Sequence, residues 1–246
     1  MSGAAATTAD LQARLQRSEA HNAALQAELE RFAYTVSHDL RAPLRHITAY
    51  APLVREMLAE GEDPAQCLDT LEQAARNMAR MLDAVLELSR LSRVALQPVM
   101  LPMGSLVAEA QRALASAAAG RQVEWQLPDS WPEVHGDAVL IRQLWQQLLS
   151  NALKFTRPRA QAQIALGWEL QDGALAFWVR DNGVGFNPAA SGSMFDLFQR
   201  LHTTSEFEGA GVGLALARQI VLRHGGGIQA EGALDGGGTL RFTLPG

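Results

Sequence analysis

The stretch Phe32-Ala-Tyr-Thr-Val-Ser-His-Asp-Leu-Arg-Ala-Pro-Leu44 decides how the first part of this sequence folds. Val36 and Leu40 lie four residues apart within it, which places both on one face of a helix. His38 is two residues from each, so at about 100° per residue its imidazole points roughly 200° away from that apolar face. Most helix histidines are solvated surface residues, so His38 becomes a candidate for chemistry only through the rest of the chain.

Apolar and small residues recur at alternating spacings of four and three before His38. The row consists of Leu11, Leu15, Ser18, Asn22, Leu25, Leu29, Phe32 and Val36. This heptad pattern predicts a coiled coil, and a polar residue at the a-type position of Asn22 favours parallel two-stranded pairing. The alternative is one amphipathic helix packed inside a monomer.

The regular spacing changes beside His38. From Val36 the apolar row continues with two consecutive steps of four, to Leu40 and Leu44. Such a stutter locally unwinds a heptad supercoil, and Pro43 removes a backbone donor and should bend the helix. We therefore expect the backbone to be least regular next to His38, which would suit a site that receives a visiting domain.

A second helix is predicted from apolar residues at three-four spacing between Leu68 and Val85, running to about Ala95. Gly61-Glu-Asp-Pro64 separates the two helices with a helix-ending glycine, an acidic N-cap candidate and a proline. Two long helices joined by a short turn form a hairpin. A dimer that makes a four-helix bundle would cover the apolar faces of both helices.

Length and composition limit the class of protein. A chain of 246 residues is long enough for two modest domains, and its net charge of −5 gives no electrostatic reason to expect nucleic-acid binding. The single Cys67 excludes an intrachain disulfide and fits a reducing compartment. No stretch approaches the roughly 20 apolar residues of a membrane span, and the N-terminus lacks signal-peptide features. We expect a cytoplasmic protein without a membrane span.

The composition shifts after Pro98 towards a mixture of helices and strands. The predicted elements are a helix at 103–119, a strand at 123–127, a helix capped by His135-Gly-Asp137, strands at 164–170 and 175–179 joined at Asp172-Gly173, a helix at 214–224, and two strands around the glycine turn at 236–238. Helices beside a sheet of antiparallel appearance favour an α+β sandwich.

One face of the helix after Asp137 carries Gln147, Asn151 and Lys154 at positions i, i+4 and i+7. An amide oxygen can ligate Mg²⁺ without adding charge, and a lysine can neutralise a phosphate oxygen. A solvated polar helix face would explain the same residues.

Two glycine-containing segments follow. In Asp181-Asn-Gly-Val-Gly-Phe186, a carboxylate at a strand end could accept from an exocyclic amine beside glycines that admit a planar ring, although a plain turn is also consistent. Gly209-Ala-Gly-Val-Gly213 precedes a helix, where free N–H groups and the helix dipole favour phosphate. It is neither a Walker A loop nor a Rossmann fingerprint.

From about residue 25 to the C-terminus, these motifs in this order resemble a two-component sensor histidine kinase. The His38 segment is similar to the phosphoacceptor box, and Gln147–Phe155 to the N box. The first glycine box is matched by 181–185, the phenylalanine box by 195–200 and the second glycine box by 209–213. The terminal glycine-threonine element is matched by 236–239. The amino-acid sequence around several of these boxes is particularly similar to that of bacteriophytochrome-type kinases.

The resemblance implies a fold and a domain order. The expected parts are a disordered N-terminus at 1–9, a coiled coil at 10–35, a dimerisation and histidine phosphotransfer domain at 36–98, and a catalytic ATP-binding domain at 99–246. The first two helices would form a dimeric four-helix bundle, and the last part an α/β sandwich of the GHKL (Bergerat) type.

The resemblance also implies ATP bound as a Mg²⁺ complex. Asn151 would hold the metal and Lys154 a phosphate, and Asp181 would accept from the adenine amine. The Gly211 and Gly213 amides would bind the phosphate chain, under a lid at 187–208 that places Arg200 near the phosphates. The other residues implied for ATP binding are Phe155, Gly183, Gly185, Phe195, Phe198, Gly209, Leu214 and Thr239.

The implied reaction is autophosphorylation of neutral His38, with Asp39 orienting the ring and accepting its proton, followed by transfer to an aspartate of a response regulator receiver domain. The implied partners are a second copy of the chain, that receiver domain, and a separate or removed sensor module. Two alternatives use the same motifs: an ATPase of the same superfamily, whose acceptor is water or another protein, and a non-catalytic dimeric scaffold.

Two residues depart from the family pattern. Gln147 stands where many members carry Asn or an acidic residue, which puts the usual base or solvent-ordering role at that position in doubt. Ala42 stands four residues after His38, where members with strong phosphatase activity tend to carry Thr or Asn. We therefore expect a kinase with weak phosphatase activity towards its regulator.

Overall fold

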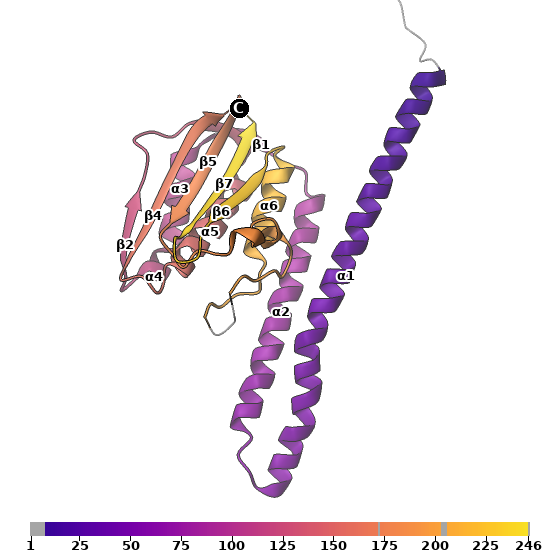
Figure 1. Cartoon of the computed structure of the whole chain (residues 1–246), viewed down its shortest axis with the longest axis vertical. Coiled ribbons are helices and arrows are strands. Elements are labelled where there is room, and N and C mark those ends of the chain that lie inside the picture. The colour runs from indigo at the N-terminus through magenta and orange to yellow at the C-terminus, as the bar shows by residue number, and fades with distance from the viewer. Residues whose placement is uncertain (1–7, 172, 203–205, 246) are drawn as a thin grey trace, which may run out of the picture. The chain divides into compact units, whose positions relative to one another are not determined.

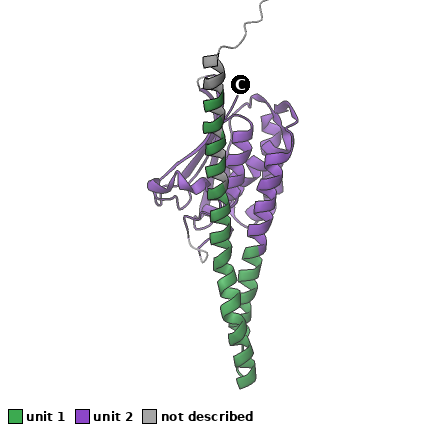
Figure 2. Ribbon diagram, turned by 90° about the vertical axis from the view of Figure 1, so that its right-hand side faces the viewer, with its two compact units in different colours: residues 1–78 green, residues 79–246 purple. Residues whose placement is uncertain are grey.

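The computed structural model describes residues 8–171, 173–202 and 206–245, and only some of the side chains before Glu30. The chain divides into two compact units, residues 1–78 and 79–246, coloured separately in Figure 2. Of the N-terminus expected to be disordered, residues 1–7 lie outside the described residues. Helix α1 already begins at Thr8, so the first nine residues are not all irregular.

The first unit contains helix α1 (Thr8–Glu60), which continues through Pro43, Pro52 and the expected boundary at residues 35–36. Of the coiled-coil row, the side chains of Leu11, Ser18, Leu25 and Leu29 lie outside the described ones. Leu15 and Phe32 are exposed in this single chain. The coiled coil itself stays a prediction, while the long helix that it needs is confirmed.

The predicted hairpin turn is confirmed between α1 and α2 (Ala65–Arg93). Gly61 has a φ of +76°, and Asp63 Oδ1 accepts a hydrogen bond from the Ala65 N–H at 3.0 Å, as expected of an N-cap. Cys67 Sγ lies 3.8 Å from Met57 Sδ across the turn. Helix α2 ends at Arg93, slightly before the predicted end near Ala95.

The second unit is built on a five-stranded sheet in the order β2-β4-β5-β7-β6. The strands are β2 (Gln122–Gln126), β4 (Gln161–Gln171), β5 (Ala174–Asp181), β6 (Ile228–Gly232) and β7 (Gly238–Pro245). All neighbours are antiparallel except β2 and β4, which are parallel. The expectation of an antiparallel sheet is therefore corrected to a mixed sheet, because a long crossover that contains a helix joins β2 to β4. Asp172, in the predicted β4–β5 turn, lies outside the described residues.

Three helices cover one face of this sheet: α3 (Met103–Ala113), α5 (Ala138–Phe155) and α6 (Gly213–Arg223) (Figure 1). Trp145 of α5 is fully buried, with its ring centroid 6.2 Å from that of Phe177 and 5.3 Å from that of Phe242. Edge-on aromatic pairs of this kind stabilise beyond the area that they bury. The sandwich of helices on a sheet is confirmed. The single helix predicted at 103–119 is instead divided at Leu114, since a separate turn, α4 (Ala115–Ala118), follows.

A small second sheet, absent from the expectations, joins β1 (Pro98–Pro102) to β3 (Glu133–Asp137). β1 occupies the segment expected to begin a linker, and it pairs because Leu101 and Val134 are buried in the core of the second unit. Asp137, at the end of β3, caps α5 as predicted, with its Oδ1 accepting from the N–H groups of Val139 (3.0 Å) and Leu140 (3.2 Å).

Two 3₁₀ turns, η1 (Pro188–Ala190) and η2 (Ser193–Phe195), precede α6. Within the described residues, no helix combines the length and apolarity that crossing a membrane requires.

Candidate active site

His38 lies on α1 with its ring held by two neighbours. Its Nδ1 is 2.8 Å from Asp39 Oδ1, and the Tyr34 ring stacks on the imidazole with centroids 6.1 Å apart and 19° between planes. Because a carboxylate oxygen accepts, Nδ1 is the donor in the neutral imidazole, and the lone pair then lies on Nε2. The His38 side chain is 65% exposed, so this nitrogen is open to an incoming electrophile. The structure confirms the contact between the predicted nucleophile and Asp39.

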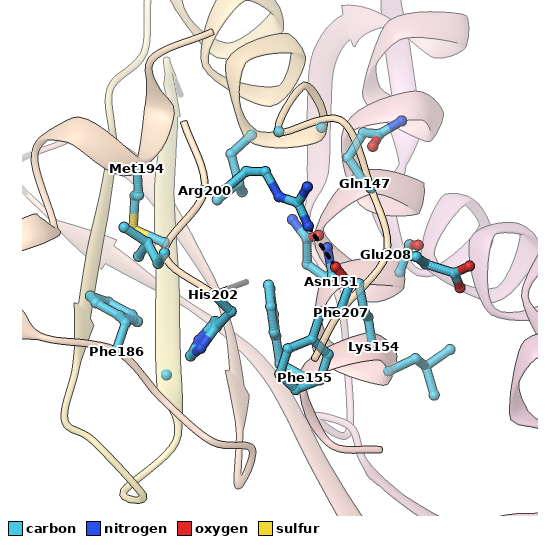
Figure 3. A pocket seen from close by; sticks show the side chains of 18 of the residues that line it. Gln147, Asn151, Lys154, Phe155, Phe186, Met194, Arg200, His202, Phe207 and Glu208 are labelled. Carbon is cyan, nitrogen blue, oxygen red and sulfur yellow. Dashed lines mark hydrogen bonds between the residues drawn. The ribbon is translucent and has the colours of Figure 1, made fainter. Parts of the chain in front are cut away.

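The second unit contains a cavity of about 350 Å³ between α5, the N-terminus of α6, and the segments that follow β5 and η2 (Figure 3). Most of the residues predicted to form the ATP site, whether for binding or for catalysis, line it. They are Gln147, Asn151, Lys154, Phe155, Asp181, Gly185, Arg200, Gly209, Gly211, Gly213 and Leu214. Four predicted residues, Gly183, Phe195, Phe198 and Thr239, do not line it. Motifs between residues 147 and 214 of the sequence therefore meet in one cavity.

Lys154 carries the positive charge of the α5 face. Burial lowers its pKa below the ordinary value, and the charges of Arg200 and Arg157 act in the same direction. Its Nζ lies 4.4 Å from the centroid of the Phe155 ring, within cation–π range. A lysine crowded by two arginines is stabilised by an incoming anion, so this end of the cavity suits phosphate.

Asp181 lies at the end of β5, where its Oδ1 accepts from the Gly183 N–H at 2.8 Å. Burial raises the pKa of this carboxyl to about 6, and hydrogen bonds from the Gly183 and Gly238 N–H groups only partly offset that effect. A carboxylate with an elevated pKa in a cleft is a typical functional group. Gly185, in the same loop, has a φ of +64° and would place a Cβ 1.8 Å from the Ala233 carbonyl oxygen, so the loop requires glycine there.

Arg159, which was not predicted as a site residue, fixes the loop that carries Asp181. Its Nε donates to the Asn182 carbonyl at 2.8 Å, and its Nη2 to the carbonyls of Gly183 and Asp235, both at 2.9 Å. One guanidinium therefore holds three carbonyl oxygens from two separate loops, a task that suits its planar fork of donors. Nothing in the local sequence distinguishes it from nearby Arg157.

Phe195 and Phe198 do not line the cavity, but Phe198 contacts the second glycine loop beside it. Both are buried, and Phe195 packs in a small cluster with Phe186, Met194 and Ala230. The Phe198 N–H donates to the Gly211 carbonyl at 2.9 Å. Gly211 has a φ of +70°, and a Cβ there would lie 2.6 Å from the Phe198 carbonyl carbon. The Phe198 backbone thus helps to hold the loop in place, and the expected direct role of both phenylalanines in ATP binding stays a prediction.

The segment expected to form a lid, whose residues 203–205 lie outside the described residues, has a hydrogen bond within itself and another to Arg157, and all four residues involved line the cavity. Arg200 Nη2 donates to the Phe207 carbonyl at 2.7 Å (Figure 3). Glu208 accepts from Arg157 Nη2 at 2.7 Å, and this partner lowers the pKa of the Glu208 carboxyl. Four further residues line the cavity that were not predicted as site residues: Arg157, His202, Phe207 and Glu208.

Comparisons with known protein families match both parts of the chain. Residues 28–93 match the His Kinase A (phospho-acceptor) domain, and residues 136–246 match the family described as histidine kinase-, DNA gyrase B-, and HSP90-like ATPase. The chain belongs to the two-component sensor histidine kinases. The predicted family is confirmed by the two domains in their expected order.

Curated histidine kinases are similar to nearly the whole chain. The methanogenesis regulatory histidine kinase FilI of Methanothrix harundinacea is 37% identical over 238 residues, which is 96% of this chain and 26% of that protein. Cyanobacterial phytochrome A of Nostoc sp. is 34% identical and covers 89% of this chain and 29% of its own length. The chain thus spans between a quarter and a third of these relatives, and a phytochrome among them agrees with the predicted likeness.

Solved structures of this family share the fold. Histidine kinase ThkA, solved in complex with the response regulator protein TrrA, has a TM-score of 0.67 at 19% identity, covering 97% of this chain and 67% of its own. Full-length ShkA, solved in complex with AMPPNP, has a TM-score of 0.58 at 24% identity, covering 86% and 44%. At these identities the likeness concerns the arrangement of helices and strands.

Proposed function

We propose that this histidine kinase chain binds ATP in the cavity of its second unit and transfers the γ-phosphoryl group to Nε2 of His38. The observation that carries the proposal is the Nδ1 contact of His38 with Asp39, which leaves the lone pair on the exposed Nε2. The same chain provides a cavity lined by the half-buried carboxyl of Asp181 and by Lys154 and Arg200. An ATPase alone would not need the His38–Asp39 pair.

Different residues would bind the adenine and the phosphate chain of the nucleotide. Asp181 would accept a hydrogen bond from the adenine amine. The N–H groups of Gly211 and Gly213 at the N-terminus of α6, with Lys154 and Arg200, would bind the phosphate chain. In the reaction, the Nε2 lone pair forms a bond to the γ-phosphorus while the bond to the β-phosphate oxygen breaks and ADP leaves. Asp39 then takes the Nδ1 proton, which neutralises the imidazolium.

Magnesium fits this cavity as an ion bound mainly to the nucleotide. Among the described residues, no cluster of three or more His, Cys, Asp or Glu side chains could hold a metal. Asn151 lines the cavity, and a single neutral oxygen ligand suits an ion that keeps several waters and binds phosphate oxygens. When bound, the ion would neutralise charge on the phosphates, and Asn151 would orient it.

The proposal extends to partners. A second copy of the chain would complete a four-helix bundle, and phosphohistidine would pass its phosphoryl group to an aspartate of a receiver domain. The structure of ThkA with its response regulator supports a partner of that class. The input would come from a sensor module, separate or part of a longer chain, and the site of action would be the cytoplasm, where ATP is supplied.

Labelling tests the proposal directly. Incubation with γ-labelled ATP and Mg²⁺ should label the wild-type chain with an acid-labile, alkali-stable phosphoryl group, because a phosphorus–nitrogen bond hydrolyses in acid. His38→Ala should lose the label, while His46→Ala, on the same exposed helix, should keep it. Label that persists in His38→Ala would contradict the assignment. Release of phosphate without any labelled chain would favour the ATPase reading.

The absence of a polar side chain at position 42 should make the phosphatase activity weak. Ala42 lies one helical turn after His38, where Thr could orient a water molecule towards an aspartyl phosphate. Ala42→Thr should therefore raise the rate of regulator dephosphorylation several-fold while autophosphorylation stays within about twofold. Rapid dephosphorylation by the unphosphorylated wild type, with no gain in Ala42→Thr, would refute this expectation.

A further inference from the structure

The His202 side chain contacts three segments that meet at the cavity. Its Nε2 lies 2.9 Å from the Gly185 carbonyl oxygen, in the loop that follows Asp181. Its ring centroid lies 5.4 Å from that of Phe155, the last residue of α5, and 5.3 Å from that of Phe207, two residues before the second glycine box. In Figure 3 the His202 ring lies between Phe186 and the Phe155–Phe207 pair.

The geometry of the His202 contacts fixes both the direction of its Nε2 hydrogen bond and the angles between the three rings. A carbonyl oxygen only accepts, so Nε2 is the donor, which orients the ring edge towards the loop. Phe155 and Phe207 also contact each other, with centroids 5.1 Å apart and 65° between planes. All three rings therefore meet at tilted or edge-on angles, which aromatic pairs prefer. Phe207 is buried, although it belongs to a segment with a neighbouring exposed residue, Glu208.

The three rings line the same cavity as Asp181, the half-buried carboxyl four residues before Gly185. Through the Gly185 carbonyl, the ring cluster is joined to the loop that carries this carboxyl. We propose that His202 is a positioning residue that holds the nucleobase side of the cavity in shape, so that Asp181 and the Phe155 ring present themselves to adenine together. This inference rests on the proposed ATP site.

A role in positioning predicts a loss of base selectivity rather than a general loss of binding. ATP has an exocyclic amine where GTP has a carbonyl oxygen, so an ionised Asp181 should favour ATP in the wild type. The phosphate end depends on Lys154, Arg200 and the α6 N-terminus, none of which His202 contacts through a hydrogen bond or ring pair in the described structure. Removing His202 should therefore lower the affinity for ATP while leaving the affinity for GTP nearly unchanged.

Calorimetric titration of the full chain with MgATP and with MgGTP tests this. His202→Ala should raise the Kd for ATP about tenfold, which corresponds to about 1.4 kcal/mol, and the Kd for GTP less than about twofold. His135→Ala, an exposed histidine on β3, is the matched control and should change neither. An unchanged Kd for ATP, or an equal loss for both nucleotides with a lower melting temperature, would overturn the inference.

A second variant covers the case in which His202→Ala is too unstable to measure. His202→Phe keeps the contacts with Phe155 and Phe207 but cannot donate to the Gly185 carbonyl. A reduced preference for ATP over GTP in this variant supports the inference, and an unchanged preference overturns it. Failure of the wild type to bind ATP would count against the proposed function, whereas ATP binding that His202 does not influence would count against this inference alone.

Discussion

At the scale of single residues, Asp181 combines burial with a loop that donates to it. Its pKa is raised to about 6 by burial, so the carboxyl changes charge just below neutral pH. Arg159 holds the carbonyls of Asn182 and Gly183, which keeps the loop in the shape that presents this carboxyl to the cavity. The strength of Asp181 as a hydrogen-bond acceptor therefore depends on pH, in a pH range where binding is readily measured.

ATP affinity should fall as the pH drops through about 6. Above that pH the ionised carboxylate accepts from the adenine amine, whereas below it the neutral acid is a weaker acceptor. The Kd should rise about tenfold between neutral pH and pH 5, the difference between a charged and a neutral hydrogen bond. Asp181→Asn should bind ATP weakly with a flatter profile, since only titration of the nucleotide remains. Titrations at several pH values measure this, and parallel profiles for the two proteins would contradict it.

At the scale of elements, Asp137 joins the start of α5 to the segment after α2. Its Oδ2 accepts from the Gln97 N–H at 3.1 Å, its Oδ1 caps α5, and its own N–H donates to His224 Nε2 at 3.1 Å. One carboxylate therefore satisfies donors from a helix end and from the entry to β1. The polar face of α5 carries Gln147, Asn151 and Lys154, which line the cavity. The cap that fixes the start of α5 therefore also helps to fix the site.

Replacing this cap should lower the stability of the second unit. Asp137→Ala removes two capping bonds and the Gln97 bond, which should cost about 2 kcal/mol and lower the melting temperature by several degrees. Asp137→Asn, which keeps an acceptor oxygen for the cap, is the control and should lose less.

The acid dependence of this effect has a definite sign. Burial would raise the Asp137 pKa, but hydrogen bonds from Gln97, Leu140 and Val139 together with His224 hold it below its ordinary value of 3.8. A lowered pKa contributes stability above the ordinary value, and that stability is lost as the pH falls through the folded value. The difference between wild type and Asp137→Ala should therefore shrink below about pH 4, and thermal melts that show a constant gap would exclude this account.

At the scale of the whole molecule, the helical hairpin leaves large apolar side chains uncovered. Those exposed on α1 and α2 within the described chain include Leu44, Leu53, Leu58, Leu68, Leu82 and Leu86. Full burial of an exposed leucine is worth about 1.5–3 kcal/mol. These side chains are about half exposed, so a second copy that covers them gains roughly half of that amount for each. This is the physical basis for the proposed dimer.

In solution the chain should have twice its 26.6 kDa mass. Leu44→Glu would place a charge in the seam between copies and should shift the mass towards the monomer, because a buried unpaired carboxylate is costly. Leu234→Glu, at an exposed leucine of the second unit, should leave the dimer intact. Light scattering measures the mass, and calorimetry should show that Leu44→Glu still binds ATP. A monomeric wild type would contradict the proposal.

The sequence by itself determined the helical hairpin with its turn, the Asp137 cap, the sandwich class and the family, because each depends on spacing and residue chemistry within short segments. Tertiary structure decided the rest. The β1–β3 pair, the parallel β2–β4 pair and the roles of Arg159 and His202 consist of contacts between residues far apart in the chain, such as Arg159 and Asp235. Such contacts leave no periodic or local pattern, since a hydrogen bond across 76 positions constrains neither partner's neighbours. His38 belongs to the first group: its spacing placed it on the exposed helix face, and the two residues that orient its ring, Asp39 and Tyr34, lie within four positions of it on the same helix.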